Sequence, residues 1–194
     1  MRSPSEHAPQ RWQKLGVDPY AHTRIFDVQS VHYQHPRRGT KKNFFVIDAP
    51  DWVMVIALTP ARELVLVRQF RYGIDDFSLE PPGGVVDRGE DPMVAGVREL
   101  REETGYVGDP ARLLGSVHPN PAMQNNRMHI LLVENARRTA DESWDEDEEI
   151  EIAVRPVDEV FALATSGGIT HALALDALLL FSPIWQKLKG GGVV

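Results

Sequence analysis

The sequence predicts an α/β fold with an antiparallel β-hairpin near the N-terminus, and three observations support this prediction. Short runs rich in β-branched and other apolar residues recur along the chain, as expected for strands. Between them lies a short helix with capping residues at both ends, and two more helical segments follow near the C-terminus. With 194 residues, 42% of them hydrophobic, the chain can bury one substantial core with a small N-terminal addition.

The N-terminal part is predicted to contain the hairpin. Residues 23–33 and 43–48 carry apolar residues in short strand-like runs, and the turn-prone sequence HPRRGTKK lies between them. This pattern indicates two antiparallel strands. The preceding residues, 1 to about 20, are polar and contain proline, so we expect them to form a mobile or loosely docked lead-in that Trp12 and Leu15 would pin in part.

The main sheet is predicted from several apolar runs. WVMVIALTP from Trp52 and ELVLVRQF from Glu63 indicate two buried strands joined by a turn at residues 60–62. Further strands are expected at 113–118, 128–134 and 150–155, and helices at 156–165 and from Thr170 to about Phe181. Pro183 should end or kink the last helix.

The central helix is predicted to run from about Pro92 to Glu103. Asp91 is a good N-cap, proline is favoured at the first helical position, and Gly105 suits a left-handed C-cap. Helical periodicity places three carboxylates, Glu99, Glu102 and Glu103, on one face. The apolar residues that we expect to anchor the helix on the core are Val94, Val97 and Leu100, with the stem of Arg101 beside them.

The carboxylate face needs a positive charge near it. Like charges three and four residues apart cost a few tenths of a kcal/mol per pair in an isolated helix, and the C-terminal half of a helix disfavours negative charge further. Clustered carboxylates suit Mg²⁺ or Mn²⁺, whereas a thiolate site is impossible because the chain has no cysteine. A solvated acidic helix face is the alternative, and the flanking glycines favour the metal site.

The stretch from Gly84 to Tyr106 resembles the Nudix box. Gly84, five residues, Glu90, seven residues and then Arg98-Glu99-Leu100-x-Glu102-Glu103-x-Gly105 match every strictly defined position. Only Tyr106 departs, since the family more often has an aliphatic residue there. The resemblance implies a loop-helix-loop in an α/β/α sandwich with a mixed sheet, and hydrolysis of a diphosphate linked to another moiety with a divalent cation as cofactor.

The same resemblance suggests roles for single residues. It implies that the metal ligands, on the box and just before it, are Gly83 through its backbone carbonyl, Glu99, Glu102 and Glu103. It also places Arg98 among the catalytic residues. Nudix enzymes that hydrolyse ADP-ribose and other nucleoside diphosphate sugars carry a QxR segment and E-x-P-x-G just before the box, and here the matching residues, expected to contact the substrate, are Gln69, Arg71 and Glu80.

Other substrate contacts rest on weaker patterns. Pro121 lies sixteen residues after Gly105, where the ADP-ribose-type enzymes also carry a proline, although a loop proline alone indicates only a stiff turn. Trp52 would stack on a nucleobase or be buried at a strand start. Arg127, after Asn125 and Asn126, would line the sugar or phosphate side or only satisfy its loop.

Hydrolysis also needs a general base that takes a proton from the attacking water. The acidic run at 145–149 offers Glu146 and Glu148, in the region from which the ADP-ribose enzymes present theirs. Glu102 of the box is the alternative base, and a merely solvated acidic loop is a third reading.

Charge and hydropathy limit the partners and the compartment. A formal charge of 21 − 28 = −7 argues against a nucleic-acid-coating surface. The N-terminus lacks the apolar core of a signal peptide, and no apolar run approaches a membrane span, so a cytoplasmic protein is expected. We expect residues 1–50 to form a tail and hairpin at a homodimer interface and 51–194 the catalytic domain.

The sequence therefore predicts a metal-dependent pyrophosphohydrolase. Its expected substrate is a small nucleoside diphosphate sugar, ADP-ribose or GDP-mannose, split into a nucleoside monophosphate and a sugar phosphate. The alternatives are a nucleoside triphosphate pyrophosphohydrolase and a non-catalytic nucleotide sensor, and a sensor would be indicated by loss of the box glutamates, which are all present.

Overall fold

The structure, a computed structural model, describes residues 8–144 and 149–191. Its contacts divide the chain into two compact units. The N-terminal unit comprises the residues up to Ala49 together with Asn120–Asn126, and the main unit comprises Pro50–Pro119 and the residues from Arg127 onward. The expected division into 1–50 and 51–194 stays a prediction.

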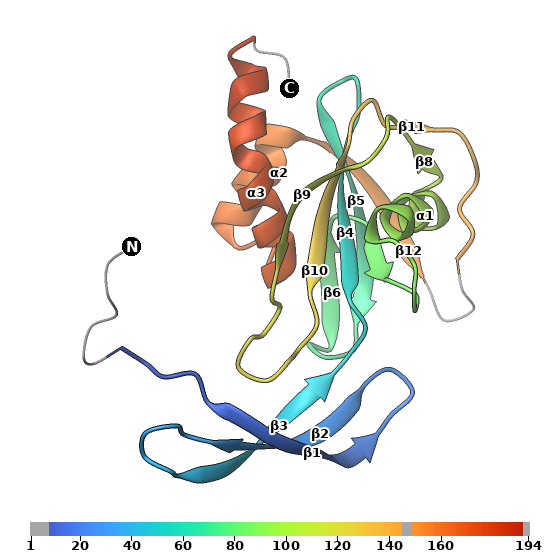
Figure 1. Ribbon diagram of the computed structural model, residues 1–194. Helices are drawn as coiled ribbons and strands as arrows, with labels where there is room; N and C mark the ends of the chain where they lie inside the picture. The colour runs from blue at the N-terminus through green and yellow to red at the C-terminus, as the bar shows by residue number, and fades with distance from the viewer. Residues whose placement is uncertain (1–7, 145–148, 192–194) are drawn as a thin grey trace. The chain divides into compact units, whose positions relative to one another are not determined.

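The N-terminal unit is built on a three-stranded antiparallel sheet (Figure 1). Its strands, in the order in which they pair, are β1 (Gln13–His22), β2 (Asp27–Gln34) and β3 (Lys41–Asp48). The predicted hairpin is confirmed, because β2 pairs with β3 along its whole length. The turn at 35–40 is closed by the amide of His35, which donates to the carbonyl of Thr40 at 2.9 Å.

Strand β1 corrects the sequence prediction. The expectation of a loosely docked lead-in up to about residue 20 was wrong for Gln13–His22, which pair with β2. Gly16 and Pro19 interrupt the run of strand-forming residues in the sequence, and the pairing of β1 with β2 shifts register next to each of them. An edge strand tolerates such residues because one of its sides needs no ladder hydrogen bonds.

The main unit contains a mixed sheet. Within the described residues it has seven strands, in the order β12-β5-β4-β10-β9 with β6 beside β5 and β7 beside β4. Among the described strands of this sheet, β4 and β10 pair in parallel and the other pairs are antiparallel. The bounds are β4 Trp52–Leu58, β5 Glu63–Arg71, β6 Asp76–Glu80, β7 Gly83–Val85, β9 Arg112–Val117, β10 Met128–Val133 and β12 Ile150–Pro156. A separate pair joins β8 (Tyr106–Val107) to β11 (Arg137–Arg138).

Three helices in the described residues cover this sheet from both sides. Helix α1 (Pro92–Thr104) lies on one face, and α2 (Val157–Ser166) and α3 (Ala172–Lys189) lie on the other (Figure 1). The predicted α/β/α sandwich is therefore confirmed. In the described part of the chain, no helix combines the length and apolar composition needed to cross a membrane.

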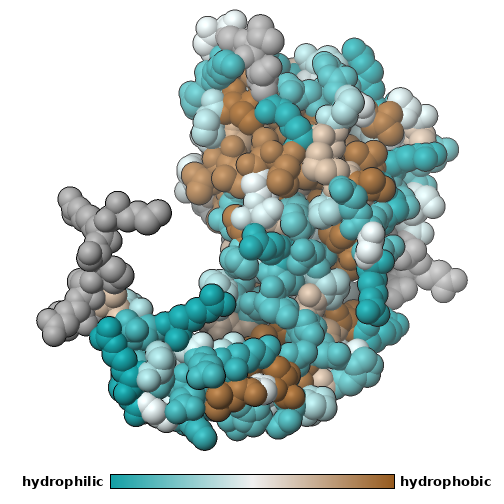
Figure 2. Space-filling view, viewed as in Figure 1, coloured by the Kyte–Doolittle hydropathy of each residue, from teal (hydrophilic) through white to brown (hydrophobic). Residues whose placement is uncertain are grey.

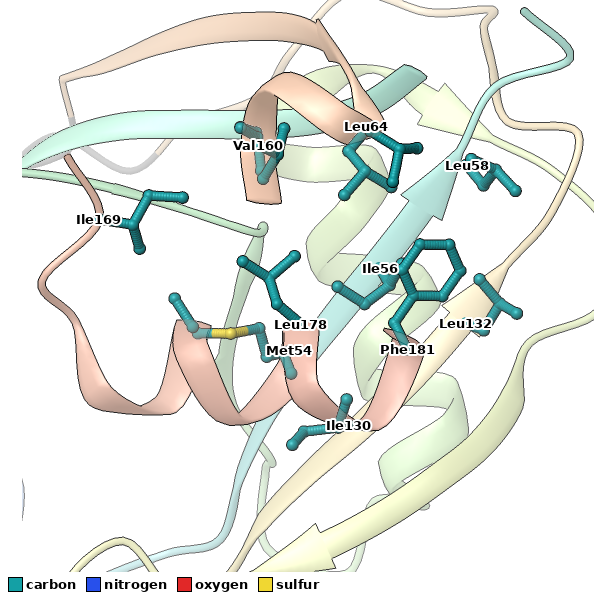
Figure 3. Packing of buried hydrophobic residues seen from close by; sticks show 14 of the residues in the cluster. Met54, Ile56, Leu58, Leu64, Ile130, Leu132, Val160, Ile169, Leu178 and Phe181 are labelled. Atoms are coloured by element: carbon teal, nitrogen blue, oxygen red, sulfur yellow. The ribbon is translucent and has the colours of Figure 1, made fainter. Parts of the chain in front are cut away.

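Side chains along β4 point alternately to the two faces of the sheet, and each face carries its own hydrophobic core. Met54, Ile56 and Leu58 belong to the cluster that includes α2 and α3, whereas the residues between them pack in the cluster with α1. Figure 3 shows Phe181 of α3 beside Ile56, and both side chains are almost fully buried. A central strand that is apolar on both faces therefore holds the two helical layers together.

Helix α3 continues past Pro183 to Lys189, so this proline does not end the helix, and the alternative that it kinks the helix stays a prediction. Proline removes the hydrogen bond to the carbonyl four residues earlier, which here belongs to Leu179. Leu179 is 69% exposed and Pro183 is also exposed. Water can reach the freed carbonyl on this outer face, and the buried face of the helix stays intact.

Helix α1 packs on the sheet through a different stripe from the expected one. Leu100 is buried as predicted, but Val94 and Val97 are 59% and 41% exposed, so their assignment to the core was wrong. The contact is made instead through Ala95 and Gly96. A Cβ atom on Gly96 would overlap a methyl group of the buried Leu131, so these small residues allow the helix to approach the sheet closely.

Strands β4 and β5 separate near one end of the sheet. They pair directly only at Ala57–Val65 and Leu58–Leu64. Beyond these pairs β6 occupies the edge of β5 and β7 the edge of β4. Two buried prolines, Pro81 and Pro82, separate β6 from β7. The separated strands leave room at this end of the sheet for a pocket.

The packing of α1 can be tested with two matched substitutions on the same helix. Leu100→Ala should lower the free energy of unfolding by about 2–5 kcal/mol, because it leaves a cavity in the core. Val97→Ala should change it by less than about 0.5 kcal/mol, because Val97 lies on the outer face. Denaturant titrations of both variants measure the difference, and a loss at Val97 equal to that at Leu100 would contradict the observed orientation.

Candidate active site

The ends of α1 are fixed as predicted. The side chain of Asp91 accepts a hydrogen bond from the amide of Met93 at 2.7 Å, and Gly105 adopts φ 69° and donates to the carbonyl of Arg101. These caps set the helix register. They thereby place the box carboxylates in the last two turns.

Arg98 lies at the centre of the carboxylate cluster. Its Nε and Nη2 donate to the two carboxylate oxygens of Glu90 at 3.1 and 3.0 Å. Its Nη1 donates to Glu99 at 2.7 Å and to Glu102 at 3.0 Å. Nη2 also donates to the backbone carbonyl of Val85 at 3.2 Å. One guanidinium group thus ties the helix to the loop that precedes it.

These contacts shift the protonation equilibria of the partners. The Arg98 hydrogen bond is the largest influence on Glu90 and holds the pKa of that carboxyl below its usual range. The pKa of Arg98 is raised, and the hydrogen bond to Glu90 is the largest cause. The hydrogen bonds to Glu99 and Glu102 act in the same direction with smaller effects. Both shifts keep the groups charged at neutral pH.

Gly83 and Gly84 bring the loop against the helix carboxylates. The amide of Gly83 donates to Glu103 at 2.9 Å, and Glu103 is only 3% exposed. A Cβ atom on Gly84 would lie 2.6 Å from the carboxylate of Glu99. A side chain at position 84 would therefore push Glu99 away, so the glycine of the box allows this close approach.

The chemistry of these residues fits a divalent cation. The four carboxylates of the cluster, Glu90, Glu99, Glu102 and Glu103, outnumber the one guanidinium among them by three negative charges. Carboxylate and carbonyl oxygens are the donors that Mg²⁺ and Mn²⁺ prefer. Within the described ranges no three acidic or histidine side chains already converge in a metal-binding arrangement, and Glu99 and Glu102 instead direct oxygens to Arg98.

The segment before the acidic run returns to the end of α1. The amide of Ser143 donates to the carbonyl of Glu102 at 2.8 Å, and the indole of Trp144 donates to the carbonyl of Glu103 at 2.9 Å. The chain thus enters the acidic run directly beside the box. The two candidate bases in that run, Glu146 and Glu148, lie outside the described residues.

A pocket of about 450 Å³ opens where β4 and β5 separate. Its walls come from the starts of β4 and β10, from β7, from the β5–β6 hairpin and from the N-terminus of α3. Polar groups in the lining include Arg71, Ser78 and His171. Gly83 and Gly84 also line it, so the pocket borders the carboxylate cluster through the same two glycines.

Glu80 organises the polar side of this pocket. Its carboxylate is fully buried and accepts hydrogen bonds from Gln69 at 3.0 Å, from Ser78 at 2.9 Å and from Arg71. Burial acts to raise the pKa of Glu80, but His171 and Arg71 outweigh it, so the pKa lies below its ordinary value. Glu80 therefore stays ionised and faces protein groups.

The remaining predicted contacts are spread over both units. Trp52 is partly buried at the start of β4 and lines the pocket. Arg127 is exposed, and its amide donates to Asp51 at 2.8 Å. Pro121 is exposed and belongs to the N-terminal unit. Within the main unit, the structure brings Trp52, Gln69, Arg71 and Glu80 together at one end of the sheet.

Sequence reasoning missed His171 and Ser78. No motif marks either residue, and His171 is brought to Glu80 only by the packing of α3 on the sheet. Ser78 carried a local signal, because a strand after Arg71 with alternate inward residues would place it on the same side as Glu80.

Comparisons with known proteins agree with this arrangement. The family model of the NUDIX domain matches residues 49–177. The methanol dehydrogenase activator of Bacillus methanolicus is 30% identical over 137 residues, which cover 70% of this chain and 74% of that protein. The ADP-ribose pyrophosphatase of Bacillus subtilis (strain 168) is 28% identical, with 69% and 72% covered.

A solved structure described as an ADP compounds hydrolase superposes on the whole chain. The TM-score is 0.80 at 25% sequence identity, and 100% of both chains is covered. The family match spans most of the chain and contains the carboxylate cluster and all strands of the main sheet. The chain therefore belongs to the NUDIX domain family and is an enzyme, a Nudix hydrolase with ADP-ribose pyrophosphatases among its relatives.

Proposed function

We propose that this protein hydrolyses the diphosphate of a nucleoside diphosphate sugar, ADP-ribose or GDP-mannose in type, with Mg²⁺ or Mn²⁺ as cofactor. The observation that carries the proposal is the position of Gly83 and Gly84. They line the pocket that contains Arg71, and they also contact Glu103 and Glu99 of the carboxylate cluster. A diphosphate bound in the pocket would therefore lie beside the proposed metal ligands.

The cation would be held by Glu99, Glu102, Glu103 and the backbone carbonyl of Gly83. A divalent ion held there would neutralise charge on the diphosphate oxygens and would lower the pKa of water bound to it. Arg98 keeps Glu99 and Glu102 in position through its fork of donors. Arg71 offers the planar group that suits a phosphate, and Trp52 offers a ring on which a nucleobase can stack.

Water must lose a proton as it attacks one phosphorus and as the bridging P–O bond breaks. We infer that Glu146 or Glu148 would accept this proton, because the amide of Ser143 and the indole of Trp144 tie the preceding segment to the end of α1. Glu102, whose side chain is 45% exposed, is the alternative base. The products are a nucleoside monophosphate and a sugar phosphate.

A hydrolysis screen tests the proposed function. ADP-ribose, GDP-mannose and the common nucleoside triphosphates should be incubated with the full chain and Mg²⁺ or Mn²⁺, with products identified by mass. We expect a diphosphate sugar to be cleaved to a nucleoside monophosphate and a sugar phosphate. Preferential release of pyrophosphate from triphosphates would contradict the proposal in favour of a triphosphate pyrophosphohydrolase, and binding without cleavage would indicate a sensor.

The metal ligands can be tested by removing single charges. Glu102→Gln and Glu103→Gln should each keep the fold but lower kcat by about two or more orders of magnitude, because the cation loses an anionic donor. Glu159→Gln, on α2 at an exposed ion pair with Arg155 of β12, should retain normal rates. Near-normal activity in both box variants would contradict the metal-site assignment.

The acidic run can be separated from the box by its kinetics. If Glu146 or Glu148 is the base, its change to Gln should slow the chemical step and leave metal affinity almost unaltered. A run that only docks over substrate predicts a higher KM with little change in kcat. Metal titrations and steady-state rates of the two single variants and the double variant distinguish these cases, and unchanged kinetics in all three would leave Glu102 as the base.

The N-terminal unit supports a proposed homodimer. Its sheet and the connection between β1 and β2 expose large apolar residues (Figure 2). Ile25 is 67% exposed, Phe44 44% and Phe45 56%. Strand β1 is exposed along its whole length. Because exposed apolar surface of this kind favours association, we propose that a second copy of the chain covers this sheet.

Light scattering tests the dimer. The wild-type chain should have twice its monomer mass at micromolar concentration, and Phe45→Asp should shift the equilibrium toward monomer by placing a charge in the contact. Leu179→Asp, which adds the same charge to an exposed position of α3, should leave the mass unchanged. If the wild-type chain is monomeric at micromolar concentration, the proposed homodimer is wrong.

A further inference from the structure

The carboxylate of Glu80 is surrounded by protein groups on both oxygens. Oε1 accepts from Gln69 and Arg71, and Oε2 accepts from Ser78. Nδ1 of His171 lies 2.9 Å from Oε2. Three groups of the main unit therefore donate hydrogen bonds to this carboxylate, and the buried Nδ1 of His171 lies within ion-pair distance of it without completing a hydrogen bond. Glu80 is fully buried among these four groups, so its influence on the pocket acts through its neighbours.

The neighbour that reaches the pocket as a cation is Arg71. It lines the pocket and its side chain is 43% exposed. Its Nε atom is buried and has no hydrogen-bond partner among the described residues. The contact between Nη2 and Glu80 is the ion pair that the structure gives to this side chain. The direction of the Arg71 guanidinium thus depends on how firmly Glu80 is held.

His171 lies at the N-terminus of α3, where a side chain commonly caps the helix. It is the N-cap of α3, and N-cap side chains usually accept a hydrogen bond from the first turn. His171 makes no such bond. It lines the pocket, is partly buried, and directs Nδ1 toward Glu80 instead. The histidine therefore connects the start of α3 to the carboxylate that holds Arg71.

We propose that His171 is a positioning residue that fixes Glu80 and, through it, the orientation in which Arg71 binds the diphosphate of the substrate. This inference rests on the proposed function, since it assigns the partner of Arg71 as a diphosphate. It also changes the role expected for Glu80 from a ligand contact to the support of one. The side chain that touches the ligand is Arg71.

A purely structural role for His171 predicts different behaviour. If the histidine only anchors α3 to the sheet, its loss would lower the melting temperature and damage the site whether or not Arg71 is present. If it acts through Arg71, its effect on ligand binding should vanish once Arg71 is removed. A double-mutant cycle separates the two roles, because it measures the coupling between the residues directly.

The experiment compares His171→Leu, His171→Asn, Arg71→Ala and the double variant His171→Leu/Arg71→Ala. Asparagine keeps a donor near the place of Nδ1. Leu179→Ala, on the outer face of the same helix, is the control. For each variant we would measure kcat and KM for ADP-ribose with Mg²⁺, the dissociation constants of ADP-ribose and of inorganic pyrophosphate in the presence of EDTA, and the melting temperature.

We expect His171→Leu to raise KM and both dissociation constants about tenfold, as for a lost contact to a charged group, with kcat changed by less than about twofold. His171→Asn should recover most of the affinity, and Leu179→Ala should match wild type. In the Arg71→Ala background, His171→Leu should have no further effect on binding.

Two results would overturn the inference. One is an equal loss of affinity from His171→Leu with and without Arg71, which would assign His171 a structural or direct role. The other is unchanged pyrophosphate and ADP-ribose affinity in His171→Leu. The proposed function fails separately, if the wild-type chain cleaves no diphosphate sugar, and the pyrophosphate cycle still decides the role of His171 in that case.

Discussion

The interaction on which the site depends is the contact of the Arg98 guanidinium with Glu90, Glu99 and Glu102. Three carboxylates this close repel one another, and the cation between them reduces that repulsion while its rigid fork sets their directions. The half-buried position of the cluster strengthens each of these interactions relative to bulk water. The negative charge that Arg98 leaves uncompensated is what a divalent cation would neutralise.

A second buried charge supports the other side of the pocket. Glu80 fastens β5, β6 and the start of α3 to one another through neutral and cationic partners. Burial of an unpaired carboxylate would be costly, and here Oε1 accepts two hydrogen bonds, whereas Oε2 accepts one and lies 2.9 Å from Nδ1 of His171. The two charge clusters meet at Gly83 and Gly84, the residues that leave space for a close approach of backbone and carboxylates. The proposed chemistry would therefore take place between two hydrogen-bonded polar networks.

The features that the sequence predicted correctly are local ones. The caps of α1 and the spacing of Glu99, Glu102 and Glu103 follow from helix geometry alone, and the apolar runs of β4 and β5 identify buried strands without reference to the rest of the chain. The resemblance to the Nudix box also predicted the loop that carries Gly84, because the motif fixes the number of residues between this glycine and the helix.

The features that were missed depend on tertiary packing. The buried face of α1 could not be placed correctly, because Gly96 allows the helix to lie closer to the sheet than Val94 and Val97 would permit. Strand β1 was hidden by Gly16 and Pro19, which an edge strand tolerates. The contact between His171 and Glu80 joins two distant parts of the chain, and no sequence pattern indicates it.

The central claim, that the carboxylate cluster around Arg98 holds a divalent cation, is tested most directly by titrating the chain with Mn²⁺ and following the free ion by electron paramagnetic resonance. The wild-type chain should bind Mn²⁺ in the absence of substrate, and Glu99→Gln should weaken the affinity by about tenfold or more, because an anionic donor is lost next to Gly84. Equal Mn²⁺ affinity in the wild-type chain and in Glu99→Gln would contradict the account.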